Sequence, residues 1–231
     1  MPDAPEHSLN HFARYAFTPA YWSLDAAGQE RFHRELLAGL RQAAPACHLY
    51  QLFPAEAEAD LLVWSARPAG AADDPAAFFE DYARALNPWR LLLQPVSMLW
   101  GLTGASSYSK ARSTQEIDPF TAERSRYLVV YPFVKTTEWY LLGADARQGM
   151  MNEHIRVGKQ FAAITQLLLY SFGLQNQEFV VVYETDDLAA FSDLVRQLRS
   201  TDGRAYTERD TPLHTAMHLP ADQALALWRP G

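Results

Sequence analysis

Apolar residues recur with two periods along the first 104 residues of the chain. Some segments are short apolar or alternating runs, which predict strands, and others repeat apolar residues with the period of a helix. The predicted strands are residues 11–22, which lead into a turn, and residues 47–53, 60–68 and 91–104. The predicted helices are residues 27–44 and 75–89. Pro95 lies within the last strand, where it indicates a sheet edge or a bulge. This order of elements predicts a ferredoxin-like half.

A polar segment separates this half from a second one with a similar pattern. Residues 105–125 have no clear period and are too long for a simple connector, which indicates a lid or a binding loop. The nearly continuous apolar run 126–134 predicts a buried strand. A long helix is predicted from about Ala144 to Tyr170. The remaining predictions are strands at 177–186 and 204–212 and a helix at 187–200.

Together these elements predict an α+β fold. We expect two ferredoxin-like halves, residues 1–104 and 126–231, joined by the inter-domain loop 105–125. Their strands are expected to form a β-barrel-like core flanked by helices. A chain of 231 residues is long enough for two small units that share one core.

Net charge and cysteine content narrow the choice of partner and compartment. The formal net charge of −7 argues against nucleic acid and against a membrane surface, since both call for a basic field. No secretory signal is visible, and the longest apolar run, residues 162–174, is interrupted by Thr165 and Gln166, so no membrane insertion is expected. Cys47 is the only cysteine, which excludes an internal disulfide and a thiolate metal cluster. We therefore expect a protein of the reducing cytoplasm.

The segment MMNEHIRVGKQF, residues 150–161, places one histidine on an apolar helical stripe. Met150, His154, Gly158 and Phe161 share this face because they are spaced by three or four residues. Glycine at the position one turn after His154 leaves a hollow beside the imidazole, which a flat apolar ligand could fill. A proximal haem histidine needs such a wall and such room, together with an acceptor for its second N–H. The alternative is a core histidine that is hydrogen-bonded to a neighbouring carbonyl.

Four segments, in this order, resemble the chlorite dismutase superfamily, and within it they are most similar to the coproheme decarboxylases. The segments are YPFVKTTEWYLL at 131–142, MMNEH at 150–154, YSFGLQNQEFVVVYETDDL at 170–188 and LRSTDGRAYTERDTP at 198–212. The resemblance covers residues 126–212, and the first half agrees only in architecture. It implies two ferredoxin-like halves per subunit, a homo-oligomeric ring that is often a pentamer, and haem bound in the C-terminal half with His154 as the iron ligand.

The resemblance also implies roles for three residues that precede His154. Tyr131 would carry the oxidising equivalent to a substrate propionate, and the alternative is a core tyrosine with a bonded hydroxyl. Lys135 shares a strand face with Tyr131, and it would bind a propionate and assist the second decarboxylation. The alternative for Lys135 is a solvated strand end. Trp139 would pack beside the haem, although ordinary aromatic core is the other interpretation.

Asp202 and Arg204 match a proximal acid and a propionate-binding arginine of the family. The acid of the family, usually glutamate, is hydrogen-bonded to the proximal histidine, which strengthens the imidazole as an electron donor. Asp202 is one methylene shorter, so its contact with His154 is direct, bridged by water or absent. Arg204 suits a bidentate pair with a carboxylate. Both residues could instead form a plain surface turn.

The distal residue decides which reaction the resemblance implies. Chlorite dismutases place an arginine on the segment that follows the proximal histidine. Counting forward from His154 reaches Leu167, and aligning backward from Ser171 reaches Gln166; neither is arginine. We favour Gln166, since many decarboxylases have glutamine there. One branch of the family uses an upstream distal histidine instead, but this chain has Thr114 at that spacing and no histidine between residues 49 and 153.

Tyr108, Lys110 and Arg112 place a phenol and two cations in the inter-domain loop. Coproheme, the substrate that the resemblance to the decarboxylases implies, carries four propionates, so these residues are candidates for binding it, although a solvated loop is the alternative. The sequence thus predicts oxidative decarboxylation of iron coproporphyrin III (coproheme) to haem b with hydrogen peroxide and no other cofactor. Two alternatives remain open: a haem b peroxidase or weak chlorite dismutase of the same fold, and a noncatalytic haem-binding or haem-transfer protein.

Overall fold

The computed structural model describes residues 7–70, 75–106, 108 and 113–229. The first half contains β1 (Ser8–Phe17), α1 (Pro19–Trp22), α2 (Ala26–Ala43), β2 (Ala46–Gln51), β3 (Leu61–Pro68), α3 (Pro75–Leu86), the 3-10 turn η1 (Asn87–Trp89) and β4 (Leu93–Leu102). The second half contains β5 (Tyr127–Lys135), α4 (Thr137–Leu141), α5 (Ala144–Gly158), β6 (Thr165–Tyr170), β7 (Phe179–Thr185), α6 (Leu188–Leu198), the 3-10 turn η2 (Asp202–Tyr206), β8 (Thr207–Arg209), β9 (His214–His218) and α7 (Ala221–Ala226).

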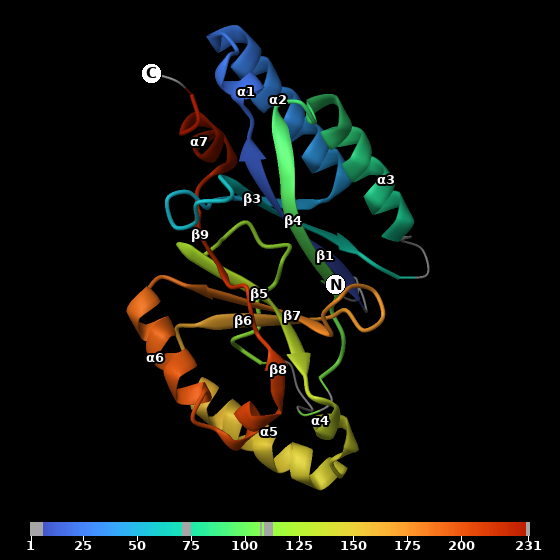
Figure 1. The fold of residues 1–231 in the computed structure, drawn as a ribbon, viewed down its shortest axis with the longest axis vertical. Helices are drawn as coiled ribbons and strands as arrows, with labels where there is room; N and C mark the ends of the chain where they lie inside the picture. Colours follow the sequence, from blue (N-terminus) through green and yellow to red (C-terminus); the bar gives the residue numbers. More distant parts are fainter. Residues whose placement is uncertain (1–6, 71–74, 107, 109–112, 230–231) are drawn as a thin grey trace.

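Strands from both halves close into one antiparallel barrel. The strand order is β7-β6-β4-β1-β3-β2-β9-β5, and β5 pairs with β7 to complete the ring. The short strand β8 pairs with the last residues of β5, Val134 and Lys135. The pairs β4–β6 and β2–β9 join the halves. Helices α1–α3 and α7 lie at one end of the molecule and α4–α6 at the other (Figure 1). The predicted α+β fold with a barrel core and flanking helices is confirmed.

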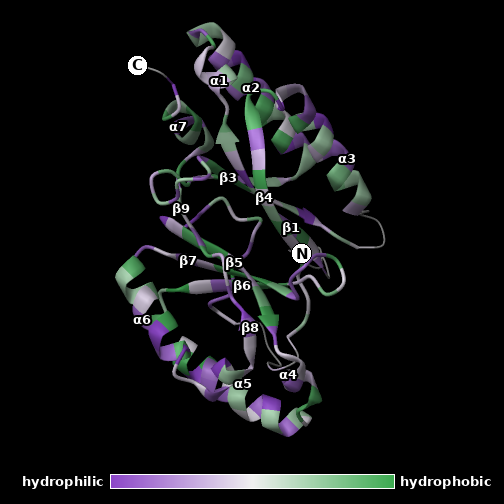
Figure 2. Ribbon diagram, viewed as in Figure 1, coloured by the Kyte–Doolittle hydropathy of each residue, from purple (hydrophilic) through white to green (hydrophobic). Residues whose placement is uncertain are grey.

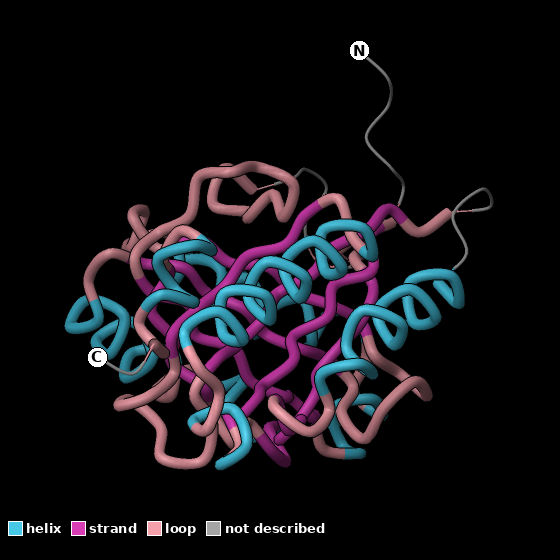
Figure 3. The backbone as a smooth tube through the Cα atoms, turned by 90° about the horizontal axis from the view of Figure 1, so that it is seen from above, coloured by secondary structure: helices cyan, strands magenta, loops and turns pink. Residues whose placement is uncertain are grey.

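Strand alternation divides the apolar residues between the barrel interior and the helices. On β1, Phe12 faces inward with Trp64 of β3 and Val182 of β7, whereas Ala13 and Tyr15 pack against the helices of the first half. Green and purple residues accordingly alternate along the helices in Figure 2, and Figure 3 shows these helices lying across the strands. The barrel interior is therefore a packed core, and a large ligand must bind on the outside.

Helices α5 and α6 cover part of the outer face of β5 and β7. Val129 and Tyr183 of the sheet form a buried cluster with Val157 of α5 and with Phe191 and Leu194 of α6. Asp187 caps the N-terminus of α6, because its carboxylate accepts from the amides of residues 189 and 190. The rest of this outer face stays open for a site.

One predicted element is wrong. The helix expected from Ala144 to Tyr170 ends at Gly158, and residues 165–170 form strand β6 instead. In the structure Leu167 and Leu169 point into the barrel interior, as alternate residues of a strand do. The sequence of this run, TQLLLY, is short and largely apolar, so its pattern alone does not distinguish a strand from a helix.

Two smaller features concern strand ends. Of the strand expected at 204–212, only β8 is extended, and residues 202–206 form η2. The bulge expected at Pro95 is confirmed, because the β1–β4 register shifts opposite it, between Arg14 and Tyr15. None of the helices in the described part of the chain is long and apolar enough to cross a membrane.

The end of the inter-domain loop is anchored inside the barrel. Ile117 belongs to the inner apolar cluster, and the buried Arg124 lies 3.6 Å from the carboxylate of Glu184 on β7. Burial raises the pKa of Glu184 to about 7, although the charge of Arg124 acts in the opposite direction. The guanidinium of Arg124 also lies 5.1 Å from the Trp64 ring centroid. These contacts fix where the chain enters β5.

Candidate functional site

The candidate site lies on the outer face of β5, β6 and β7, beside α5. Strand register places side chains of this face in rows. One row contains Tyr131, Val181 and Leu168, and the next contains Phe133, Phe179 and Tyr170. Since side chains two residues apart share a face, Lys135 continues beyond Phe133. The sheet thus presents a phenol and an ammonium group on one largely apolar surface.

His154 projects from α5 next to open space. Burial, and to a smaller degree the charge of Lys135, lowers the pKa of His154 to about 4, so the ring is neutral at physiological pH. Within the described residues the ring has no hydrogen-bond partner, which leaves a lone pair available for a metal. A Cβ built on Gly158 would meet no atom within 4 Å, and the same holds for Gly203 of η2. Open space therefore borders Gly158, one turn after His154, as the predicted hollow requires.

Lys135 is held between an aromatic ring and a carbonyl. Its Nζ lies 4.1 Å from the ring centroid of Trp139, which is buried on α4, and donates to the carbonyl of Gly203 at 3.2 Å. Burial and the nearby Arg204 lower the pKa of Lys135 to about 8, while Glu178 acts in the opposite direction. Lys135 is thus a poorly hydrated cation without a direct carboxylate partner among the described residues, which favours binding of an incoming anion.

Tyr131 lies beside a second tyrosine that sequence reasoning missed. Burial raises the pKa of Tyr131 well above its usual value, and the neighbouring hydroxyl of Tyr183 adds to the effect. The two rings are nearly parallel, with centroids 6.4 Å apart. Alternation along β7 places Tyr183 on the outer face, but only the β5–β7 register brings it next to Tyr131. Tyr131 is therefore a protonated phenol at neutral pH.

The turn η2 brings Arg204 to the edge of the site but turns Asp202 outward. Arg204 donates to Asp210 at 2.5 Å and contributes to the lowered pKa of Lys135, so the two cations are close. The Asp202 side chain is exposed, and within the described residues no hydrogen bond joins it to His154. Its amide instead donates to the carboxylate of Glu153 at 3.1 Å. The hydrogen bond of Asp202 to His154 stays a prediction, and the structure shows no direct contact between the two described side chains.

Gln166 and Leu167, the two candidates for the distal residue, lie on opposite faces of β6. Leu167 is buried inside the barrel, whereas Gln166 is exposed on the outer face. The backbone of Gln166 pairs with the loop through Gln115 and Ile117. Leu168, 44% exposed, lies in the same row as Tyr131. Gln166 is thus the only one of the two aligned residues that can reach the site, and Leu168 adds an apolar wall that sequence reasoning missed.

The inter-domain loop reaches the site through Tyr108. Its ring packs edge-on against Trp139, with centroids 6.4 Å apart, and its carbonyl accepts from Gln148 of α5 at 3.3 Å. Lys110 and Arg112 lie outside the described residues. Met150, one turn before His154 on α5, is half-buried. The loop therefore contributes one aromatic side chain next to the lysine–tryptophan pair.

These groups fit an iron porphyrin with propionates. The neutral His154 beside a hollow suits an axial ligand, the aromatic and aliphatic side chains suit the ring, and the cations at one edge suit carboxylates. The hollow at Gly158 and Gly203 is the observation that allows a ring to approach. A metal ion bound only by protein side chains would need several ligands, whereas a porphyrin supplies its own four nitrogens.

Comparisons with known proteins agree with this arrangement. The chain is 29% identical over 183 residues to coproheme decarboxylase from Mycolicibacterium smegmatis, across 77% of this chain and 75% of that protein. It is 28% identical over 155 residues to coproheme decarboxylase from Staphylococcus saprophyticus, across 62% and 61%. A mutant chlorite dismutase from Candidatus Nitrospira defluvii has the same fold, with a TM-score of 0.82 at 22% identity over 95% of this chain and 94% of that one. A family model described as chlorite dismutase matches residues 29–219, and the chain therefore belongs to the chlorite dismutase family.

Proposed function

We propose that the chain catalyses the oxidative decarboxylation of iron coproporphyrin III to haem b with hydrogen peroxide. The observation that carries the proposal is the convergence of Tyr131, Lys135 and His154 on one outer face beside a hollow. The two coproheme decarboxylases among its relatives support it. The homo-pentameric ring of the family is part of the proposal, and the mass of the assembly in solution tests it.

The porphyrin iron is part of the substrate and, with peroxide, supplies the redox chemistry. His154 binds the iron through its neutral ring. Tyr131 loses an electron and a proton together and then takes a hydrogen atom from the β-carbon of a propionate. The bond to the carboxyl group breaks after loss of a second electron, carbon dioxide leaves and a vinyl group remains. For each propionate, one hydrogen peroxide is reduced to two waters, so the two electrons and all atoms balance.

The cations select and orient the propionates. Lys135 is already directed by the Trp139 ring and the Gly203 carbonyl, so little side-chain freedom is lost when a carboxylate binds. Arg204 uses one N–H group for Asp210 and retains other donors for a second carboxylate. Tyr131 lies four residues before Lys135 on β5, so the two side chains point to the same face of the sheet. This spacing brings the phenol near the carbon chain of a propionate whose carboxylate is held by the lysine.

The deciding experiment follows the mass of the porphyrin. Purified protein is mixed with iron coproporphyrin III, hydrogen peroxide is added, and the porphyrin is extracted for mass spectrometry. We expect two successive losses, each of one carbon dioxide and two hydrogens. An unchanged porphyrin together with oxidation of a peroxidase dye would favour a haem b peroxidase, and delivery of the porphyrin to a second apoprotein without reaction would favour a transfer protein.

The protein should release little oxygen from chlorite. Gln166 is the polar residue on the outer face where chlorite dismutases have arginine, and an uncharged amide cannot form an ion pair with the oxidant. Oxygen release is followed with an electrode after loading with haem b. Gln166→Arg, which supplies the missing cation on the same strand face, is the matched variant and should release more oxygen than the parent. Rapid and sustained release by the parent protein would contradict the prediction.

Porphyrin binding should weaken as the pH rises through about 8. The pKa of Lys135 is lowered to about 8, so the ammonium group that attracts a propionate is present below this pH and lost above it. Metal-free coproporphyrin III is titrated against the protein between pH 6.5 and 9.5, because it has no iron-bound water that titrates. A charge-assisted hydrogen bond contributes about 1.5–3 kcal/mol, so a loss of roughly tenfold or more in affinity is expected. Lys135→Met should bind weakly with no step near pH 8, and an equal step in both proteins would rule out Lys135 as its origin.

A further inference from the structure

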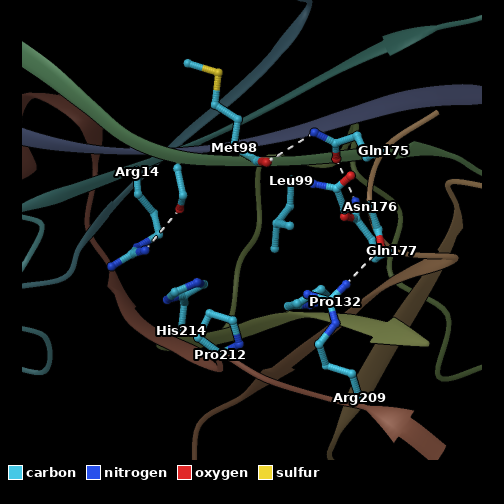
Figure 4. Close-up of a pocket in the computed structure, with 11 residues that line it drawn as sticks. Arg14, Met98, Leu99, Pro132, Gln175, Asn176, Gln177, Arg209, Pro212 and His214 are labelled. Carbon is cyan, nitrogen blue, oxygen red and sulfur yellow. Dashed lines mark hydrogen bonds between the residues drawn. The ribbon is translucent and has the colours of Figure 1, made fainter.

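A cavity of about 320 Å³ opens at one end of the barrel. Arg14 of β1, Leu99 of β4, Pro132 of β5 and Arg209 of β8 are among the residues that line it (Figure 4). Because Pro132 follows Tyr131 on β5, the two side chains point to opposite sides of the sheet. The cavity is therefore separated by β5 from the face that carries Tyr131, and it is too small for a porphyrin.

We propose that this cavity binds a small molecule that carries an oxyanion, either a carboxylate or a phosphate. Among the described residues the wall contains two arginines and a histidine, and no aspartate or glutamate lines it. This is the reverse of the chain as a whole, whose formal net charge is −7. Arg14 is paired with Glu56, so Arg209 is the lining cation that is left to attract an anion into this concave site.

On one side of the cavity, Arg14 is held in place inside the barrel by its polar contacts. The side chain of Arg14 is 7% exposed, donates to Ser97 Oγ at 3.0 Å and forms a short ion pair with Glu56. Nδ1 of His214 lies 2.9 Å from the other oxygen of Glu56, behind the cavity wall. Glu56 thus holds the His214 ring in one orientation, and Nε2 has no partner among the described residues. Nε2 of His214 is therefore available to a bound ligand.

The opposite side of the cavity carries Arg209, which has no carboxylate partner among the described residues. Arg209 donates to the carbonyl of Asn176 at 2.9 Å, and among the described residues no aspartate or glutamate lies within 4.0 Å of its guanidinium. Figure 4 shows Arg14 and His214 on one side of the cavity and Arg209 with Asn176 on the other. An oxyanion at Arg209 can accept two parallel hydrogen bonds.

Apolar residues between the two polar sides define the rest of the ligand. Leu99 and Pro132 lie between them, so the ligand has a short carbon body that contacts these side chains. The cavity volume is at the lower end of small-molecule sites, which run from roughly 300 to 1,000 Å³. A small organic acid or a small phosphate ester satisfies both conditions. This inference does not depend on the proposed reaction, since no residue is shared with the outer face.

The test compares two anion classes on the full chain. Succinate and inorganic phosphate are titrated at constant ionic strength, with sodium chloride as the reference, by calorimetry and by the shift in thermal unfolding midpoint. We expect saturable binding of at least one of them; succinate alone identifies the ligand as a carboxylate, and phosphate alone identifies a phosphate. Failure of both to saturate would overturn the proposal, whatever the outcome of the decarboxylation assay.

Variants of Arg209 locate the binding. Arg209→Gln should weaken the binding at least tenfold, and Arg209→Lys should retain part of it because the charge remains. Arg209 is half-exposed and its side chain contacts only one carbonyl by hydrogen bond, so the fold should persist, which circular dichroism verifies. Arg31→Gln, on the exposed face of α2, removes the same charge away from the cavity. Equal weakening by Arg31→Gln would show a general charge effect and would refute the site.

Discussion

Replacing Tyr131 with phenylalanine should stop the loss of carbon dioxide from iron coproporphyrin III while the fold is retained. Phenylalanine keeps the ring that packs on the outer face of β5, and only a hydroxyl with its hydrogen bond is lost, at a cost of about 1 kcal/mol in the free energy of unfolding. A benzene ring has no labile O–H and is much harder to oxidise, so no hydrogen atom can be taken from the propionate. Mass spectrometry of the extracted porphyrin should show unreacted or bleached coproheme in place of haem b.

The matched control for this variant is Tyr183→Phe. Tyr183 is adjacent to Tyr131, is buried in the cluster under α5 and α6 against which Tyr131 packs, and loses the same atom on substitution. It lies one row farther from Lys135 along the sheet, so haem b should still form in this variant. If Tyr131→Phe produced haem b at the rate of the parent protein, the phenol would be structural and the proposed route for the electron and proton would be wrong.

Replacing His154 with alanine should abolish the spectrum of histidine-ligated iron. His154 has a lowered pKa, no hydrogen-bond partner within the described residues and open space beside it at Gly158, so its loss removes an available nitrogen and few packing contacts. The protein should remain folded, and its affinity for iron coproporphyrin III should fall by tenfold or more. Absorption spectra of the ferric complex measure both effects, and added imidazole should restore part of the parent spectrum.

Two further variants make this result specific. His7→Ala removes an exposed histidine whose Nδ1 contacts the carbonyl of Thr103, and its spectrum should match the parent. Gly158→Leu keeps the His154 ring but fills the hollow, so porphyrin binding should weaken while metal-free protein stays folded. An unchanged spectrum in His154→Ala would mean that another residue binds the iron.

The local hydrophobic period predicts most helices and strands of the first half correctly. It fails for segments whose structure depends on pairing with a distant strand. Short apolar or alternating runs predict β1 and β3, which are buried on both faces, and helical period predicts α2 and α3, which bury one face. The run 165–170 is short and apolar, so its own pattern allows a helix or a strand, and only its pairing with β7 makes it a strand. Strand β9 was not predicted, since it is short and pairs with β2 from the other half.

The candidate site shows the same division between local and nonlocal information. The spacing of Tyr131 and Lys135 predicts a shared face, and the helical stripe predicts the hollow beside His154. Tyr183 and Leu168 join this face only through strand register, which a single sequence does not encode locally. The contact of Asp202 with Glu153 depends on how η2 packs against α5, and no spacing rule could have indicated it.

The closed ring of strands has a consequence for how the chain folds during synthesis. Strand β2 leaves the ribosome early, but its outer edge pairs with β9, which is made long afterwards. Leu225 and Trp228, from the same late segment, also fill the apolar core of the first half. A nascent first half therefore carries an exposed strand edge and an incomplete core, the features that promote aggregation. Since neither half is complete alone, the barrel closes only after β9 has left the ribosome, and until then the nascent chain exposes surfaces that the finished barrel buries.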